Sequence, residues 1–218
     1  MRFADGVVIA GDRRATSGNL ISYRTMQKVF PADRHSAVAI AGAAGTAIEM
    51  VRLFQLQLEH YEKVEGKELS LDGKASQLSQ LLRQNLPMAR AGMVVVPLFA
   101  GYDLRNEEGR LFQFDVSGGR YEELEYGVTG SGSLHASTVL KLGYRFGQDL
   151  DAAVDLAIKS LYVAADEDSA TGLPDFIRGL FPVVATVTAD GYQEVDDDDI
   201  RDRSQRLVDE LVDQGMPS

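Results

Sequence analysis

Cysteine is absent from this chain of 218 residues. Without it there can be no disulfide scaffold, no zinc site with cysteine ligands and no thiol nucleophile, and the composition suits the cytosol. Histidine is scarce: only His35, His60 and His135 are present. They are scattered and none has the spacing of metal ligands such as HExxH, so we expect no metal site.

Long apolar runs and an excess of basic charge are also lacking. No stretch reaches the length of a membrane span, and the N-terminus has no basic segment followed by an apolar block, so we expect no membrane span and no signal peptide. The formal net charge is −11 and the sequence pI is about 4.7. An acidic chain repels phosphate backbones, so nucleic acid is not an expected partner. The acidic residues gather in 194–199 and 102–126, which we interpret as solvated surface.

The apolar pattern predicts a single α+β domain over residues 1–218. Strands and helices come in separate groups along the chain, which favours two antiparallel sheets face to face between helix pairs, a four-layer αββα sandwich, over a doubly wound fold. A broad apolar surface on the first helix indicates cover from a neighbouring subunit. Residues 2–12 predict the start of a hairpin, with a turn at Asp5-Gly6 and a short buried strand at 7–10. Period-2 or continuous apolar stretches predict further strands at 26–30, 36–41, 93–102, 110–116, 121–128, 181–188 and 192–195. Helical spacing predicts helices at 47–61, 71–91, 133–146, 149–165 and after the acidic run at 194–199.

Two charged features lie beside apolar strands. The sequence GDRR at 11–14 follows a short apolar strand and could be a buried ion-pair hub, although a solvated turn is the commoner case. Lys28 stands between Met26 and Phe30 in an alternating segment, so the three side chains share a face. A lysine on an apolar face is costly unless it is paired or functional, and the alternative is an edge lysine that reaches solvent.

Two polar loops complete the candidate features. The sequence GSGS at 130–133 separates a strand from a helix, where glycines let backbone amides converge and serine can cap the helix. It does not match the GxSxG nucleophile elbow. The sequence DEDSATG at 166–172 follows a helix and, taken alone, is a polar loop.

The order and spacing of these stretches are more specific than any one of them. Together they resemble the β-subunit family of the proteasome, a group of N-terminal nucleophile hydrolases, and the resemblance covers nearly the whole chain. The actinobacterial members are the most similar, on the evidence of LEHYEK at 58–63, AGYD at 100–103, DSATG at 168–172 and DFIRG at 175–179.

The resemblance implies a threonine-type endopeptidase without cofactor or metal. Its nucleophile is the side-chain oxygen of an N-terminal threonine, whose own α-amine accepts the proton. By similarity, Lys28 activates the threonine, Asp12 holds Lys28, and the Gly42 N–H is the oxyanion donor. The residues that support the threonine amine are, by the same similarity, Ser131, Asp166 and Ser169.

The resemblance also implies a substrate site. Thr16 and Ala44 correspond to positions that pair with the substrate backbone as an added strand. The positions similar to the S1 pocket are Ala15, Met26, Phe30, Ile40, Ala44 and Ile48. None of these carries a charge, so we expect cleavage after apolar residues.

The family places its threonine five residues before the position of Met1. We therefore expect a threonine upstream of the recorded start, with a deliberate truncation or an inactive subunit as alternatives. A non-catalytic ring subunit and a two-ring HslV-type protease also remain open. The first is opposed by the presence of the candidate catalytic residues Asp12, Lys28, Ser131, Asp166 and Ser169. The second is opposed by the DSATG loop and the long C-terminal segment 192–218.

The resemblance implies a large assembly in the cytoplasm. The expected partners are further copies in heptameric β rings, stacked α-type rings, a ring-shaped ATPase activator and unfolded protein substrates. No nucleic acid or membrane is expected among them.

Overall fold

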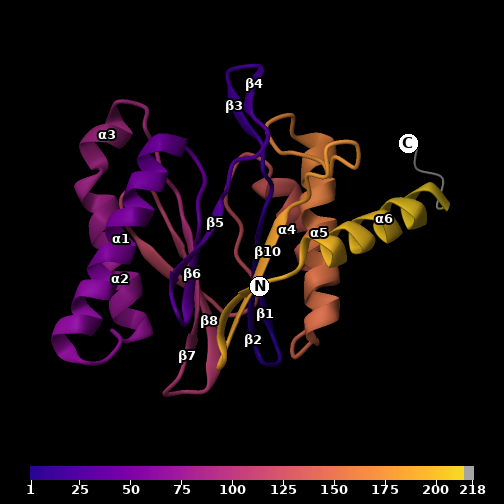
Figure 1. Cartoon of the computed structure of the whole chain (residues 1–218). Coiled ribbons are helices and arrows are strands. Elements are labelled where there is room, and N and C mark those ends of the chain that lie inside the picture. The colour runs from indigo at the N-terminus through magenta and orange to yellow at the C-terminus, as the bar shows by residue number, and fades with distance from the viewer. Residues whose placement is uncertain (214–218) are drawn as a thin grey trace.

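The computed structural model describes residues 1–213, and Figure 1 shows how their elements are arranged. The predicted domain and the C-terminal segment 192–218 both continue to residue 218, so residues 214–218 of each lie outside the described part. The strands are β1 (Arg2–Phe3), β2 (Gly6–Gly11), β3 (Ala15–Ser17), β4 (Leu20–Tyr23), β5 (Val29–Asp33), β6 (Ser36–Ala39), β7 (Leu98–Asp103), β8 (Glu108–Phe114), β9 (Arg120–Glu123), β10 (Val183–Thr188) and β11 (Gly191–Glu194). The helices are α1 (Ala44–Glu65), α2 (Leu71–Gln84), α3 (Leu86–Arg90), α4 (Ser133–Gly143), α5 (Leu150–Glu167) and α6 (Asp197–Asp213).

The strands form two main antiparallel sheets. One has the order β1-β2-β10-β11 and the other the order β5-β6-β7-β8-β9, while β3 and β4 form a separate hairpin. Every strand pair is antiparallel. The predicted α+β class with antiparallel sheets is therefore confirmed.

Three clusters of buried side chains hold these elements together. The first joins α1 and α2 to the five-stranded sheet and includes Phe54 and Phe99. The second lies between the two sheets and includes Val7 and Val29. The third joins the four-stranded sheet to α5 and α6 around Ile200. In Figure 1, α1, α2 and α3 lie on the left of the strands and α4, α5 and α6 on the right.

Element boundaries differ from the sequence predictions where proline or a turn intervenes. The predicted strand 93–102 begins only at Leu98, directly after Pro97, which has no N–H to donate to a ladder. The predicted helix 71–91 is divided at Asn85, and Pro87 lies in the first turn of α3, where a missing N–H costs nothing. The predicted strand 26–30 is wrong in its first half, because β5 begins at Val29.

The hairpin of β3 and β4 was not predicted. It turns at Gly18, whose φ of 56° favours glycine, and projects beyond the rest of the molecule in Figure 1. Its strands are only three and four residues long, too short for a clear alternating pattern. The base of this hairpin borders the candidate site.

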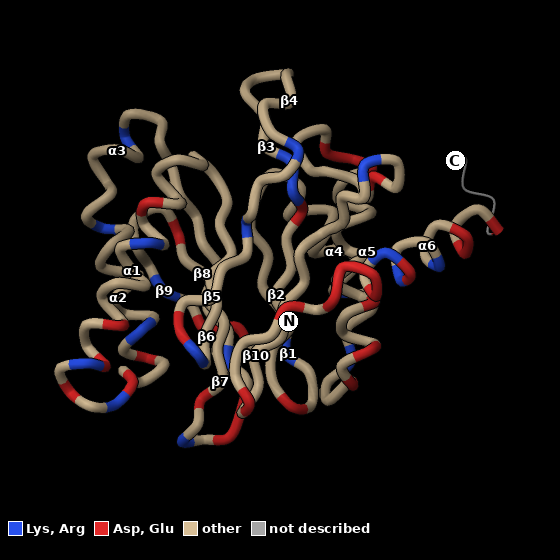
Figure 2. Tube along the Cα trace, viewed as in Figure 1, with Lys and Arg blue, Asp and Glu red and all other residues tan. Residues whose placement is uncertain are grey.

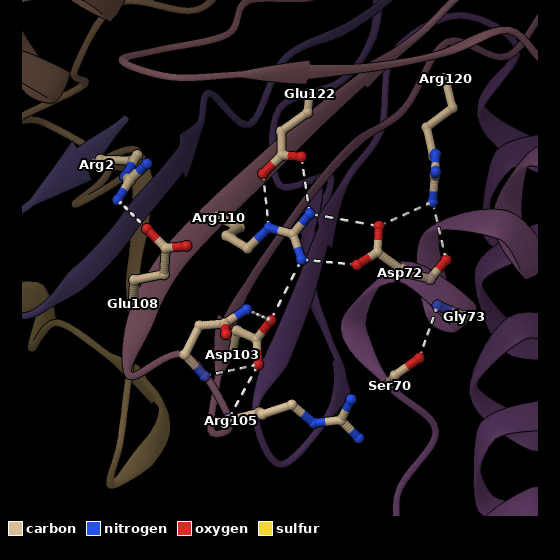
Figure 3. Close-up of polar contacts among 11 residues, drawn as sticks. Arg2, Ser70, Asp72, Gly73, Asp103, Arg105, Glu108, Arg110, Arg120 and Glu122 are labelled. Atoms are coloured by element: carbon tan, nitrogen blue, oxygen red, sulfur yellow. Dashed lines mark hydrogen bonds and ion pairs between the residues drawn. The ribbon is translucent and has the colours of Figure 1, made fainter.

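An ion-pair network joins α2 to the five-stranded sheet (Figure 3). The Arg110 guanidinium, 11% exposed, contacts Asp72 on α2, Asp103 on β7 and Glu122 on β9. The interpretation of 102–126 as solvated acidic surface is therefore wrong for Asp103, whose side chain is mostly buried.

Among residues 1–213, no helix combines the length and apolar character needed to cross a membrane.

Candidate active site

A lysine–carboxylate pair lies at the end of β2. Asp12 directly follows this buried strand, and its Oδ1 accepts a hydrogen bond of 2.6 Å from Lys28 Nζ. The side chains of Asp12 and Lys28 are 9% and 21% exposed. Lys28 lies just before β5, where its carbonyl accepts the Ile40 N–H at 2.8 Å. The predicted pairing of Asp12 with Lys28 is thus present in the structure.

Backbone amides hold the second oxygen of the Asp12 carboxylate. Asp12 Oδ2 accepts the N–H groups of Arg14 and Gly172, both at 2.8 Å. A Cβ at Gly172 would lie 3.0 Å from Arg14 Cβ, so the close approach of this loop favours glycine. Charge-assisted bonds of this kind fix the carboxylate and, through it, the Lys28 ammonium.

A second polar cluster surrounds Asp168. Its Oδ2 accepts the hydroxyls of Ser131 at 2.5 Å and Thr171 at 2.6 Å, and its Oδ1 accepts the Ala170 N–H at 3.2 Å. Burial by itself would raise the pKa of the Asp168 carboxyl, but these hydrogen bonds outweigh it, with help from the charge of His135, and lower that pKa below its ordinary value. Asp168 is therefore an ionised acceptor at neutral pH.

The structure does not bring Asp166 or the Ser169 side chain to Ser131, and this corrects the sequence prediction. Helix α5 continues to Glu167, so Asp166 is still helical and is exposed. Asp168 caps the helix with an extended backbone, φ −120° and ψ 110°, which turns its side chain toward Ser131. Ser169 is exposed and contributes its carbonyl, which accepts Arg14 Nη1 at 2.9 Å.

Asp168 and Thr171 are the site residues that sequence reasoning missed. A signal was available, because an aspartate followed by small and hydroxyl residues favours a turn closed by its own side chain. The bond from Ala170 N–H to Asp168 Oδ1 is such a turn. The same segment then folds back, so that Thr171 bonds Asp168 and Gly172 bonds Asp12.

Gly42 lies across the cavity in a conformation that requires glycine. Its φ is 102°, and a Cβ there would collide with the carbonyl of Val94. The neighbouring Ala43 N–H donates to that carbonyl at 2.7 Å. Within residues 1–213 the Gly42 N–H has no hydrogen-bond acceptor, which leaves it able to bind an oxygen inside the cavity.

These groups share one cavity of about 420 Å³. Asp12, Lys28, Gly42, Ser131 and Thr171 line it, and so do the predicted substrate residues Ala15, Thr16, Met26, Ile40 and Ala44. Phe30 and Ile48, also predicted for the S1 pocket, are not in its wall. They pack instead against the cluster between α1 and the five-stranded sheet, because β5 begins after Lys28 and directs Phe30 toward α1.

Comparison with known proteins agrees with this fold and site. The profile of the family described as "Proteasome subunit" matches residues 1–174, so the chain belongs to the proteasome subunit family. Members of this family have the fold of N-terminal nucleophile hydrolases and assemble into ring-shaped particles.

Two similar relatives carry the name "Proteasome subunit beta". The chain is 64% identical over 197 residues to that of Acidimicrobium ferrooxidans, an alignment that covers 90% of this chain and 72% of the relative. It is 53% identical over 212 residues to that of Streptomyces griseus, covering 97% and 75%. The resemblance to actinobacterial β-type subunits is therefore confirmed, and the β-subunit family is one of threonine proteases.

Proposed function

We propose that this chain is the peptidase subunit of a bacterial proteasome core, which hydrolyses peptide bonds with an N-terminal threonine. The observation that carries the proposal is the Lys28–Asp12 pair, with 2.6 Å between Nζ and Oδ1. This pair lies in the wall of a cavity that Gly42 and Ser131 also line. A half-buried lysine held by a carboxylate beside an open cavity is the environment that activates a hydroxyl nucleophile.

Strand register supports a nucleophile upstream of Met1. In the antiparallel pair of β1 and β2, Arg2 lies opposite Val7, and Met1 exchanges hydrogen bonds of 2.8 and 2.9 Å with Val8. Each residue added before Met1 along this strand moves the pairing one residue further along β2. The residue five positions upstream of Met1 would lie opposite Arg13, next to Asp12 and within reach of Lys28.

The environment of the Met1 amine also fits an upstream continuation. This amine donates to Val8 O at 2.8 Å, and burial lowers its pKa to about 5. A peptide N–H at the same place could make the hydrogen bond to Val8 O without burying a charge. We therefore propose that the strand of Met1 continues toward Asp12 and ends in the catalytic threonine.

The described residues then have distinct chemical roles. Lys28 stabilises the threonine oxygen as it loses its proton to the threonine's own α-amine, and the hydrogen bond to Asp12 holds Lys28 in the wall of the cavity. The Gly42 N–H donates to the oxyanion of the tetrahedral intermediate, a contribution of about 2.7–4 kcal/mol in other hydrolases. Ser131, held by the Asp168 carboxylate to which Thr171 also donates, supports the amine. Asp168 and Thr171 thus take the places first predicted for Asp166 and Ser169.

The substrate site favours apolar residues at P1. Thr16 and Ala44 offer backbone groups for an extended substrate, and Met26 and Ile40 give the cavity an apolar wall. Burying a leucine side chain here gains about 1.5–3 kcal/mol, whereas an unpaired charge costs several kcal/mol. A peptide library with varied P1 residues should be cut mainly after apolar residues, and a preference for Arg or Glu would contradict this pocket.

We further propose that the chain forms heptameric β rings stacked with α-type rings and served by a ring-shaped ATPase in the cytoplasm. Exposed apolar side chains on two helices support intersubunit contacts, namely Leu53 and Leu56 on α1 and Leu134 and Leu142 on α4. The three buried clusters support a four-layer sandwich of the N-terminal nucleophile type.

A fluorogenic peptide assay tests the proposed peptidase. Together with an α-type partner, the chain extended to the upstream threonine should hydrolyse the peptide, whereas the chain beginning at Met1 should not. Two variants of the extended chain, with the threonine changed to alanine or with Lys28→Ala, should fold and lose most turnover. Threonine-type turnover by the chain that begins at Met1, or near-normal turnover by Lys28→Ala, would contradict the assignment.

A further inference from the structure

The cavity of the candidate site continues inward beyond the walls assigned to the substrate. Its inner part is lined by Leu140 on α4, Leu161 on α5, and Leu98 and Leu111 on the five-stranded sheet. The four-stranded sheet packs on α5 with one face and on the five-stranded sheet with the other. A cavity that touches both of these layers at once must pass an edge of the four-stranded sheet.

That edge belongs to β2, because residues 8–12 all line the cavity. Val8 exchanges backbone hydrogen bonds with Met1 on this edge, and within residues 1–213 no strand pairs with the edge beyond that point. The N–H and C=O groups of alternate residues point to the same edge, so those of Ala10 and Asp12 point into the cavity. Unpaired backbone groups in a cavity wall are a template for an added strand.

The register of β1 fixes how a strand added to this edge would lie. We number the places before Met1 from 1 to 5, position 1 being next to Met1, so that position 2 lies opposite Ala10 and position 4 opposite Asp12. Opposite residues share a face of the sheet. Ala10 packs with the cluster at α5, so a side chain at position 2 would face the apolar wall of Leu140 and Leu161.

Side chains at positions 1, 3 and 5 would face the five-stranded sheet. Position 1 lies opposite Ile9, which packs with Leu111 in the cluster between the sheets. Position 3 lies opposite Gly11, where a Cβ would lie 3.3 Å from Lys28 Cβ. Position 5 is on the same face as position 3 and therefore on the side of Lys28. Both faces of an added strand would be buried, and its first residue would reach the catalytic pair.

We propose that the chain beginning at Met1 binds a separate extended peptide along the open edge of β2, as an added antiparallel strand. The peptide that fits is a short apolar segment of five residues with a free N-terminal threonine. Main-chain bonds to Ala10 and Asp12 hold it, and apolar side chains at positions 1–3 fill the inner cavity. Binding depends on the open edge alone, whereas recovery of peptidase activity by the bound threonine rests on the proposed function.

Isothermal titration of the chain that begins at Met1 tests the binding. The probe is Thr-Thr-Val-Val-Ala with an amidated C-terminus, which buries no carboxylate beside Met1, and it should bind as one peptide per chain. Thr-Thr-Val-Pro-Ala amide lacks the N–H that position 2 donates to Ala10 O. It should bind about tenfold more weakly or not at all. No binding of the probe, or equal binding of the two peptides, would overturn the inference.

Variants in two parts of the cavity locate the bound peptide. Leu161→Trp fills the inner part and should weaken binding of the probe by about tenfold or more. Met26→Trp fills the substrate wall and should leave the affinity for the probe unchanged. Leu142→Trp, at a 72% exposed position on α4, is the matched control. Loss of binding in Met26→Trp and not in Leu161→Trp would place the peptide in the substrate pocket and contradict the strand site.

An activity measurement separates this inference from the proposed function. Val-Thr-Val-Val-Ala amide has nearly the shape of the probe but no hydroxyl at its first residue, so it should bind with similar affinity. With an α-type partner and a fluorogenic peptide, only the probe that begins with threonine should give turnover. Binding of both peptides without turnover would contradict the proposed function and leave the strand site standing.

Discussion

At the scale of single residues, two aspartates separated by one residue have opposite environments. Asp166 is exposed on the last turn of α5, whereas Asp168 accepts hydrogen bonds from Ser131, Thr171 and Ala170. The sequence prediction did not distinguish them, because no glycine or proline marks the end of α5, and the small and hydroxyl residues that favour a turn after Asp168 were not used. Which aspartate reaches Ser131 depends on where α5 ends, and the helix ends at Glu167.

This pair gives a matched test of the site. Asp168→Asn keeps the shape of the side chain but weakens both hydroxyl bonds, so turnover of the extended chain should fall by about tenfold or more, as expected for about 1.5–3 kcal/mol of charged hydrogen bonding. Asp166→Asn should leave turnover nearly unchanged. Fluorogenic peptide kinetics on the two variants, with circular dichroism to verify folding, provide the measurement. A larger loss in Asp166→Asn would restore the first prediction.

At the scale of elements, helices were predicted more reliably than strand ends. The long amphipathic helices have many apolar positions in register, and their positions agree with α1, α2, α4 and α5. Lys28 was correctly identified as a candidate site residue, but it was wrongly predicted to lie within a strand. The resemblance placed Phe30 in the pocket, and the predicted strand kept it on the same face as Lys28, whereas β5 begins at Val29 and Phe30 packs against the cluster at α1. An alternating apolar and polar pattern does not show at which of its residues the strand begins.

A buried charge cluster ties α2 to the turn between β5 and β6, and the sequence pattern gave no indication of it. Lys74, 3% exposed, contacts Asp33 Oδ2 at 2.6 Å and Glu68 Oε2 at 2.9 Å. His35 Nδ1 adds a bond of 2.8 Å to Glu68 Oε1. The local pattern of α2 shows only a lysine near a helix N-terminus, because its partners come from distant segments.

Removing the Lys74 charge should strongly destabilise the fold. Lys74→Met keeps the length and apolar stem but leaves two carboxylates without their shared cation, which should lower the free energy of unfolding by about 3–5 kcal/mol. Lys63→Met, at an exposed pair with Glu59 on α1, is the control and should have little effect. Urea denaturation of both variants measures the difference. Equal stability of the two would show that the Lys74 cluster adds nothing to the fold.

At the scale of the whole molecule, the acidic charge lies mainly on the surface and the site lies between the layers. Figure 2 shows Asp and Glu in red on helices, turns and loops, and three aspartates occupy the first turn of α6, where they complement the helix dipole. Lys28 and Asp12 instead lie at the end of β2, where the edges of the two sheets meet the hairpin of β3 and β4. This convergence of distant segments was implied by family resemblance and not by any local pattern.

Burial of the Met1 amine makes the stability of the folded chain depend on pH. This dependence should disappear when the chain begins further upstream. Its pKa falls from 8.0 to about 5 on folding, so between these values the unfolded chain binds more protons and the free energy of unfolding rises with pH. A chain that begins at Met1 should therefore lose up to about 4 kcal/mol of stability between pH 8 and pH 5, at about 1.36 kcal/mol for each pKa unit. A chain extended upstream has a peptide N–H at this position and should not show that loss. Urea denaturation of both chains over this pH range measures the effect, because residues 2–218 are common to them and the N-terminal amine lies at a different position in each. Parallel stability curves would mean that the Met1 amine is not buried, and would remove one support for a strand that continues from Met1 toward Asp12.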